Sequence, residues 1–402
     1  MRHIVVIGAG QAGSSCVVKL RNGGFDGKIT LIGSEPVPPY QRPPLSKAYL
    51  LGDMALERLF LRPESFYAEN DIDLRMGATV EAINTKTQEI TVNGETLSYD
   101  DLVLTTGSVP HSLPEAIGGR LDGVHVVRGL ADVDAMASRF VHGARVLIVG
   151  GGYIGLEAAS VAAKLGLEVT LVEMAPRILQ RVASPETSDF FRSLHRGHGV
   201  DVREGVGLAR LTGTDAVSGA ELTDGTTLDV DFVIVGVGIA PATALAEAAG
   251  ITLDNGIAVD AHGRTNAAHV WAAGDCSSFP HGGGRIRLES VPNAIEQAEV
   301  VAENLMGAEK TYLAKPWFWS DQYDVKLQIA GLNTGYDHVV TRGQAPGPVS
   351  FWYYHGETLL AVDAANDPRG YMVGKRLIEN GKSPAPDVIA DTETDLKALL
   401  KA

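Results

Sequence analysis

The sequence predicts an α/β protein with two doubly wound parallel sheets and a C-terminal α+β domain. Residues 3–8 and 146–150 are apolar runs that each end in a G-x-G-x-x-G turn, followed by a helical pattern and a second apolar run. The composition changes at Pro316 toward aromatic and alternating residues, which indicates a separate C-terminal domain. At 402 residues and 45% hydrophobic content, the chain has room for two or three domains.

Composition excludes several classes of protein. A net charge of −15 opposes nonspecific binding to nucleic acid and to acidic membranes. Apolar runs are of strand length, well short of the roughly 20 residues of a membrane span, and Met1 leads directly into a strand. We therefore expect a cytoplasmic protein. The two cysteines, Cys16 and Cys276, have no CxxC or CxxxxC spacing and are too few for a metal cage, so we expect no metal.

The first glycine-rich turn is Gly8-x-Gly10-x-x-Gly13, between a buried strand and a helical pattern. The next strand, residues 29–32, ends at Gly33-Ser34-Glu35. Glu35 lies 27 residues after Gly8, where a carboxylate can hold the hydroxyls of an adenosine ribose. This unit is predicted to bind a dinucleotide.

The second turn repeats the plan in the middle of the chain. Gly150 permits the tight turn, Gly152 lets a pyrophosphate approach the backbone, and Gly155 lets helix and sheet pack closely. The following strand ends on Glu173, an acid 23 residues after Gly150. Two such units in one chain indicate two different dinucleotides.

A proline-dense loop follows Glu35 and contains Arg42 and Lys47. We expect a rigid loop that fixes where these cations point, with Ser46 as the N-cap of a helix. The simpler interpretation is that both are solvated cations on a surface turn.

Each nucleotide unit is expected to contain a small antiparallel sheet, at residues 80–99 and 206–230, before a last parallel strand at 102–105 and 232–235. Residues 270–275 resemble a strand that ends on Asp275, with a helix at 290–306 that returns to the first domain. Alternating runs to about residue 364 and a helix near 367–380 form the C-terminal domain. Residues 310–402 hold 10 Lys and Arg against 11 Asp and Glu, so this domain is nearly neutral in an acidic chain. It is the natural docking place for an acidic protein, unless the difference only reflects sampling of surface residues.

The chain resembles the FAD-dependent NADH:ferredoxin reductases that serve bacterial haem monooxygenases and aromatic-ring dioxygenases. The resemblance covers essentially the whole chain and lies in the motifs GAGQAG (8–13), RPPLSK (42–47), LTTG (104–107), GGGYIGLE (150–157), AAGD (272–275), ESVPNAIEQA (289–298) and WFWSDQ (317–322).

The resemblance implies an architecture like that of glutathione reductase. An FAD-binding domain (1–110 and 246–315) would carry an inserted NAD-binding domain (111–245), followed by a C-terminal interface domain (316–402). Disulphide reductases of this architecture carry a CxxxxC pair near the position of Lys47, where this chain has none. A dithiol relay is therefore excluded.

The resemblance also implies the residues that contact the cofactors. It places the FAD contacts at Gly8, Gly10, Ala12, Gly13, Ser34, Glu35, Arg42, Lys47, Val80, Arg128, Asp275 and Val291. The NADH contacts are those predicted from the second glycine-rich turn, Gly150, Gly152, Gly155 and Glu173. Lys47 and Glu157 would form an ion pair at the flavin, Lys47 favouring its reduced anionic form. Trp319 would cover the flavin on the side that faces the partner. The alternatives are that Glu157 is a solvated helix carboxylate and that Trp319 is a core residue.

The implied partner is a small acidic 2Fe-2S ferredoxin that docks near the C-terminal domain and the flavin edge of a monomer or weak dimer. The candidate docking cations are Arg285, Arg287, Lys315, Lys326, Arg369, Lys375 and Arg376. Two other classes remain open. One is a flavoprotein reductase of another acceptor, such as rubredoxin, monodehydroascorbate or oxygen. The other is a redox sensor resembling apoptosis-inducing factor, which the acidic composition disfavours.

Overall fold

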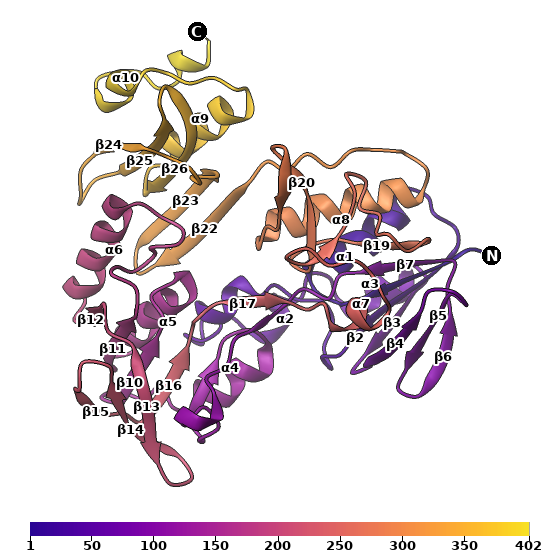
Figure 1. Ribbon diagram of the computed structural model, residues 1–402, viewed down its shortest axis with the longest axis horizontal. Helices are drawn as coiled ribbons and strands as arrows, with labels where there is room; N and C mark the ends of the chain where they lie inside the picture. Colours follow the sequence, from indigo (N-terminus) through magenta and orange to yellow (C-terminus); the bar gives the residue numbers. More distant parts are fainter. Residues whose placement is uncertain (402) are drawn as a thin grey trace. The chain divides into compact units, whose positions relative to one another are not determined.

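The computed structural model describes residues 1–401, which form two compact units. The first unit consists of Met1–Arg42, Ala55–Val109 and Ile239–Pro316. The second consists of Pro43–Met54, Pro110–Gly238 and the chain from Trp317 onward. Figure 1 shows the helices and strands of both units.

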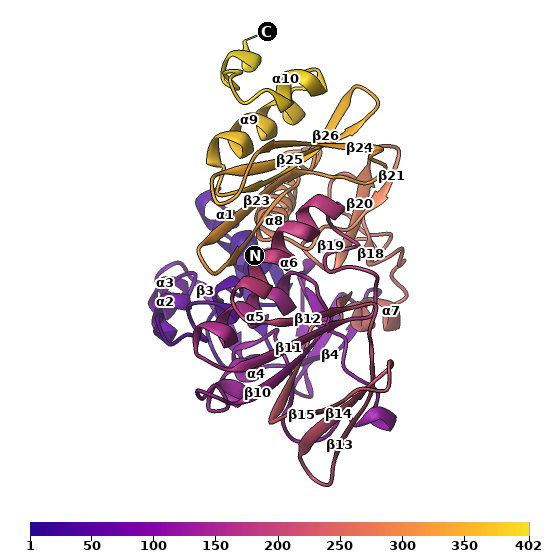
Figure 2. The ribbon, with the colours of Figure 1, turned by 90° about the vertical axis from the view of Figure 1, so that its left-hand side faces the viewer.

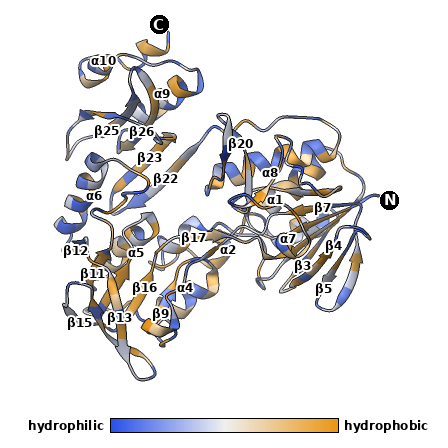
Figure 3. Cartoon of the chain, viewed as in Figure 1, coloured by the Kyte–Doolittle hydropathy of each residue, from blue (hydrophilic) through white to orange (hydrophobic). Residues whose placement is uncertain are grey.

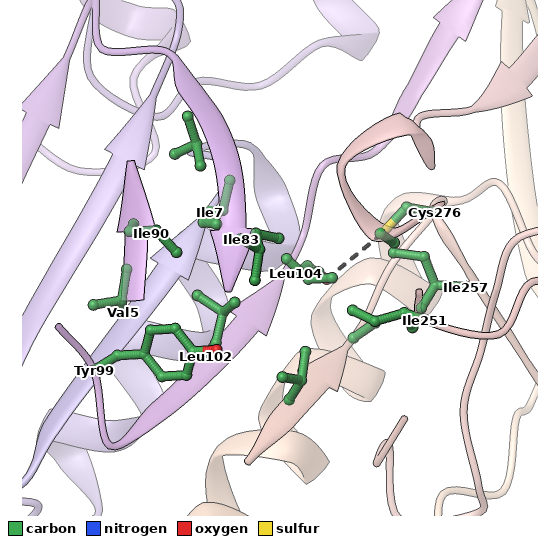
Figure 4. Packing of buried hydrophobic residues seen from close by; sticks show 14 of the residues in the cluster. Val5, Ile7, Ile83, Ile90, Tyr99, Leu102, Leu104, Ile251, Ile257 and Cys276 are labelled. Carbon is green, nitrogen blue, oxygen red and sulfur yellow. Dashed lines mark hydrogen bonds between the residues drawn. The ribbon is translucent and has the colours of Figure 1, made fainter. Parts of the chain in front are cut away.

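The first unit is built on a five-stranded parallel sheet in the order β19-β7-β1-β2-β3. Alternate residues of β1 face opposite sides of this sheet, so that both sides are buried. Ile4 and Val6 pack in one cluster with residues of α1 and α8. Val5 and Ile7 pack in another with Ile83 and residues of β5 and β7 (Figure 4). The bounds of the sheet strands are β1 His3–Ile7, β2 Lys28–Gly33, β3 Ile72–Met76, β7 Asp101–Leu104 and β19 Val270–Ala272.

Smaller elements cover this sheet. The helices α1 (Gln11–Asn22) and α8 (Val291–Leu305) lie against each other (Figure 1). An antiparallel sheet comprises β4 Val80–Asn84, β5 Glu89–Val92 and β6 Glu95–Ser98. A mixed sheet comprises β18 Ile257–Ala258, which pairs in parallel with β20 Ser277–His281, and β21 Gly284–Ile286, which pairs antiparallel with β20. The strands β8 (Ser108–Pro110) and β17 (Ile239–Pro241) pair with each other. The short helices are α2 Leu56–Leu59, α3 Glu64–Glu69 and α7 Ala244–Ala248.

The second unit contains a sheet of the same kind, in the order β12-β11-β10-β16-β9. Residues of β10 and β16 pack against the antiparallel sheet β13-β14-β15. The strands are β9 Val124–Val126, β10 Arg145–Val149, β11 Glu168–Glu173, β12 Asp201–Glu204, β13 Leu208–Gly213, β14 Val217–Leu222, β15 Thr227–Asp229 and β16 Phe232–Val235. The helices are η1 Pro43–Ser46, η2 Glu115–Ile117, α4 Leu130–Ala137, α5 Tyr153–Lys164 and α6 Pro185–Gly197.

The same unit includes an antiparallel sheet in the order β22-β23-β26-β25-β24, with α9 packed on β26 and β23 (Figure 2). Its strands are β22 Trp317–Gln322, β23 Val325–Gly331, β24 His338–Gly343, β25 Val349–His355 and β26 Thr358–Ala365. The helices that follow are α9 Pro368–Glu379, α10 Pro386–Ala390 and η3 Ala398–Leu400. The strand β22 also packs against α5, which joins this sheet to the nucleotide-type sheet of the unit.

The predicted fold class is confirmed in both parallel sheets, both small antiparallel sheets and the C-terminal α+β region. Hydrophobic colouring follows the parallel strands, whereas much of α6 is hydrophilic (Figure 3). The prediction that Ser46 caps a helix is wrong, because Ser46 is the last residue of η1 and turns follow it up to Gly52. Within residues 1–401, the helices are all too short or too polar to cross a membrane.

Candidate active site

The glycine-rich loop of the first unit leads from β1 into α1. Gly8 has a φ of +111°, and a Cβ built on it would overlap the carbonyl oxygen of Thr105. A Cβ on Gly13 would overlap the carbonyl oxygen of Gly8. The packing of the chain itself therefore requires these two glycines. Gly10 is different, because a Cβ there would meet no atom of residues 1–401 within 4 Å. This open space lies at the N-terminus of α1 and suits an anion.

In the loop between β10 and α5, the first and third glycines are likewise required by packing, and the middle one is not. Gly150, with a φ of +108°, has no room for a Cβ beside the carbonyl oxygen of Gly236, and a Cβ on Gly155 would overlap that of Gly150. A Cβ built on Gly152, by contrast, would meet no atom of residues 1–401 within 4 Å apart from those of its own turn. Both loops thus fit a pyrophosphate at the middle glycine and the first turn of a helix.

An acid closes each βαβ unit, as predicted. Glu173, the last residue of β11, accepts backbone N–H bonds from Gly151 at 2.7 Å and from Ala175 at 2.8 Å. Glu35 accepts bonds of 2.5 Å from the Tyr40 hydroxyl and from the Arg42 guanidinium. Both carboxylates are therefore fixed at the carboxyl end of a parallel strand, where ribose hydroxyls bind in this fold. Arg42 is half-buried in an ion pair, which rules out an isolated surface cation.

The turn that carries Asp275 is held by Gln297 on α8. The Oε1 atom of Gln297 accepts the N–H of Gly274 and the hydroxyl of Ser277, both at 2.8 Å. Asp275 itself accepts the Ser108 hydroxyl at 3.1 Å. The sequence pointed to the run 289–298 but not to Gln297, whose role depends on the approach of α8 to the end of β19. The sequence did not mark Gln297 apart, because the buried side of α8 also carries Asn293 and Asn304.

Lys47 and Glu157 form an ion pair of 2.8 Å between Nζ and Oε2. The side chain of Glu157 is 2% exposed and that of Lys47 is 18% exposed, so the pair is largely shielded from water. Glu157 lies on α5, and Lys47 follows η1, which packs on α5. The interpretation of these two residues as solvated surface charges is therefore wrong.

Two serines complete the surroundings of Glu157. The Ser46 hydroxyl donates to Oε2 at 2.6 Å, and the Ser320 hydroxyl of β22 donates to Oε1 at 2.7 Å. A buried carboxylate needs both charge pairing and hydrogen bonds, and here it has three donors. Ser46 thus donates its hydroxyl hydrogen to Glu157, and no helix begins directly after it.

The structure also places the remaining predicted site residues. In the first unit, Ala12 and Val80 are buried, Ser34 is exposed at the end of β2, and Val291 begins α8. In the second unit, the N–H of Arg128 donates to Asp132 at 3.1 Å before α4. Trp319 is half-buried and stacks on Trp317, with ring centroids 5.6 Å apart. Lys47, Arg128, Glu157, Glu173 and Trp319 thus belong to the second unit, and the other predicted FAD residues to the first.

The candidate docking cations differ in their surroundings. Arg287 is only 11% exposed and is paired with Glu289, so its guanidinium offers little to a partner. Arg285 donates to the carbonyl oxygens of Val259 and Ser278. Lys375 lies over the Trp317 ring, 4.8 Å from its centroid. The exposed cations of the set are Lys315, Lys326, Arg369 and Arg376.

Two dinucleotide loops, with a buried ion pair in place of a dithiol, define a flavin- and nicotinamide-dependent reductase. Comparison with known proteins agrees. Residues 2–298 match the family model described as pyridine nucleotide-disulphide oxidoreductase, and residues 317–400 match the reductase C-terminal model. The chain belongs to the pyridine nucleotide-disulphide oxidoreductase family, in which FAD and NAD(H) are the cofactors.

Within this family, several similar proteins of known name are ferredoxin reductases. The chain is 44% identical to a ferredoxin–NAD(P)+ reductase of Sphingomonas sp, over 94% of this chain and 92% of that protein. It is 40% identical to the putidaredoxin reductase of Pseudomonas putida, over 100% and 97%. A solved structure of a covalent putidaredoxin reductase–putidaredoxin complex matches with a TM-score of 0.96 and 39% identity, covering 100% of this chain and 98% of that one. The resemblance to ferredoxin reductases is thereby confirmed.

Proposed function

We propose that this protein passes electrons from NADH through FAD to a 2Fe-2S ferredoxin that serves an oxygenase, either a haem monooxygenase or a ring-hydroxylating dioxygenase. The observation that carries the proposal is the buried Lys47–Glu157 pair beside η1. Within residues 1–401, both cysteines are free and buried, so no dithiol stands between flavin and acceptor. Without a dithiol, electrons would have to leave a bound flavin directly, one at a time, as a 2Fe-2S acceptor requires.

FAD supplies the conversion of a two-electron hydride donor into a one-electron donor. The protein's part is to hold the cofactors in position. Gly8, Gly10 and Gly13 would hold the pyrophosphate of FAD, Glu35 its adenosine ribose, and Asp275 its ribityl chain. The ammonium of Lys47 provides a positive charge for the negative charge that the flavin gains on reduction, and Glu157 holds that ammonium in position.

Glu173 is proposed to select NADH over NADPH. Its two carboxylate oxygens are oriented by the N–H groups of Gly151 and Ala175, so they present a negative charge where NADPH carries a 2′-phosphate. Arg177 and Arg181 are the nearby cations whose charge would offset this repulsion. Arg177 is directed to Ser188 at 2.5 Å and to the carbonyl oxygen of Ser184 at 3.2 Å, whereas Arg181 is exposed and is the residue through which NADPH would be accepted.

We also propose how the chain is divided into domains, where the ferredoxin docks and where in the cell the protein acts. The domains are 1–110 and 246–315 for FAD, 111–245 for NAD and 316–402 for the partner interface, in a monomer or weak dimer. The ferredoxin docks at the C-terminal domain and the flavin edge, where Trp319 shields the flavin and exposed cations such as Lys326, Arg369 and Arg376 attract it. The location is cytoplasmic, which the two free thiols fit.

A panel of acceptors tests the function. Purified enzyme with NADH is mixed with a 2Fe-2S ferredoxin, a rubredoxin, monodehydroascorbate or oxygen, and the rate of acceptor reduction is followed. The proposal expects the 2Fe-2S protein to be reduced at least tenfold faster than the others. Faster reduction of rubredoxin or monodehydroascorbate would establish the alternative reductase, and slow reduction of every acceptor would favour the redox sensor.

A further inference from the structure

A line of buried polar side chains extends from Glu157 through the second unit. Three of its members come from β22 and the turn that follows it, and the fourth comes from α6, which is distant in sequence but packed against them. They are Ser320, Gln322 and His195, each 0% exposed, and the half-buried Tyr323. Trp319 and Asp321 alternate with Ser320 and Gln322 along β22, so the two polar residues share the inward face of the strand.

The contacts are continuous. Ser320 Oγ lies 2.7 Å from Glu157 Oε1 and 3.2 Å from Gln322 Nε2. Gln322 Oε1 lies 2.8 Å from His195 Nε2, and His195 Nδ1 lies 3.2 Å from the Tyr323 hydroxyl. Every buried polar atom along this line has a partner.

Assigning a donor and an acceptor to each hydrogen bond shows that every bond in the line donates in the same direction. The carboxylate of Glu157 only accepts, so the single hydroxyl hydrogen of Ser320 points to it. Ser320 Oγ then accepts from the Gln322 amide, which leaves Gln322 Oε1 as an acceptor toward His195. His195 must carry its hydrogen on Nε2, and Nδ1 accepts from Tyr323. All four donors are thus aligned toward the charge of Glu157, an arrangement in which hydrogen bonds polarise and strengthen one another.

His195 is suited to this place because it stays neutral. Burial lowers the pKa of its imidazole to about 4. A protonated ring would donate from both nitrogens, so the bond with Tyr323 would reverse and the donors would no longer all be aligned toward Glu157.

We propose that Ser320, Gln322 and His195 are positioning residues that act through Glu157, aligning its carboxylate so that Lys47 is held in place. This inference rests on the proposed role of the Lys47–Glu157 pair in flavin reduction. The competing explanation is that the line only fastens β22 to α5 and α6.

The first test examines the chain without measuring activity. The holoprotein is labelled with ¹⁵N-histidine, and His195 is assigned by its loss in His195→Gln. The expected pattern is a neutral ring with hydrogen on Nε2, and Ser320→Ala or Glu157→Gln should shift it toward the Nδ1 tautomer. The matched control is Ser350→Ala, since Ser350 is also a fully buried serine of the C-terminal sheet and bonds to Asp367 and Trp352. Hydrogen on Nδ1 in the wild type, or no response to either variant, would overturn the proposal.

The second test measures flavin reduction by NADH. Gln322→Leu and His195→Phe should slow it roughly three- to tenfold at saturating NADH, as loss of one charge-assisted bond predicts. His195→Gln keeps a donor near the Nε2 position and should restore most of the rate. In a Glu157→Gln background, His195→Phe should have no further effect. A full effect in that background, or equal loss in His195→Gln and His195→Phe, would assign a structural role only.

The two tests separate failure of this inference from failure of the proposed function. If Glu157→Gln alone leaves the rate of flavin reduction unchanged, the proposed role of the pair fails, while the tautomer of His195 still decides whether the donor chain exists.

Discussion

Asp363 gives the second unit a defined dependence on pH. Its side chain is 1% exposed on β26 and accepts hydrogen bonds from Tyr353 and, at 2.9 Å, from Thr187 at the start of α6. Burial raises its pKa from 3.8 to about 6. Because the folded state holds the proton more tightly, the contribution of Asp363 to stability is complete below pH 3.8 and is lost as the pH rises through about 6.

The size of this effect follows from the two pKa values. A difference of about two pKa units corresponds to about 3 kcal/mol, of which about 1.5 kcal/mol is lost between pH 5 and pH 7.5. Asp363→Asn keeps an acceptor for Tyr353 and removes the charge. Relative to wild type, the variant should therefore gain about 1.5 kcal/mol of unfolding free energy on going from pH 5 to pH 7.5.

Denaturant unfolding at the two pH values measures this gain. Tryptophan fluorescence suits the measurement, since three of the four tryptophans, Trp317, Trp319 and Trp352, lie in the C-terminal sheet. Asp324→Asn, at an exposed aspartate of the turn after β22, serves as the control and should show no such gain. If the difference between wild type and Asp363→Asn is the same at both pH values, Asp363 does not titrate as argued.

Three further predictions concern the nucleotide loops and the partner. Gly152→Ala should fold normally but bind NADH at least tenfold more weakly by titration, whereas Gly155→Ala should lower the melting temperature because its Cβ overlaps Gly150; equal stability of the two variants would contradict this. Glu173→Ala should reduce the preference for NADH over NADPH in kcat/KM by about tenfold or more, and comparable efficiencies of both cofactors in the wild type would reject the role of Glu173. Ferredoxin reduction should slow as salt rises from 0.05 to 0.5 M, while flavin reduction by NADH changes little; a salt-independent rate, or one unmoved by Arg369→Glu with Arg376→Glu, would place the docking site elsewhere.

Local pattern predicted most of the fold. The run 232–235 is β16, and the helix expected near 367–380 is α9, Pro368–Glu379. These elements could be predicted from the sequence because buried parallel strands are continuous apolar runs and a proline or capping residue marks the start of a helix. The need for Gly13 and Gly155 could be predicted because the atoms that crowd them lie only a few residues away in the sequence. Gly8 and Gly150 are instead crowded by the distant residues Thr105 and Gly236.

The residues around Glu157 were harder to predict from the sequence, because they come from four separate segments of the chain. Lys47 and Glu157 were predicted to pair only through the family resemblance. Ser46, Ser320, Gln322 and His195 were missed, since each is an ordinary polar residue until the chain brings them together. The alternation of Ser320 and Gln322 along a predicted strand was the one local signal. For Arg287, the charge was visible in the sequence but its burial was not.

The most direct test of the account is anaerobic stopped-flow reduction of the bound flavin by NADH in Lys47→Ala and Glu157→Ala. The control is Lys19→Ala, which breaks an ion pair with Glu303, 2.9 Å long, between α1 and α8. We predict that both site variants reduce the flavin at least tenfold more slowly than wild type while retaining FAD, and that Lys19→Ala matches wild type. Wild-type rates in both site variants would contradict the central claim.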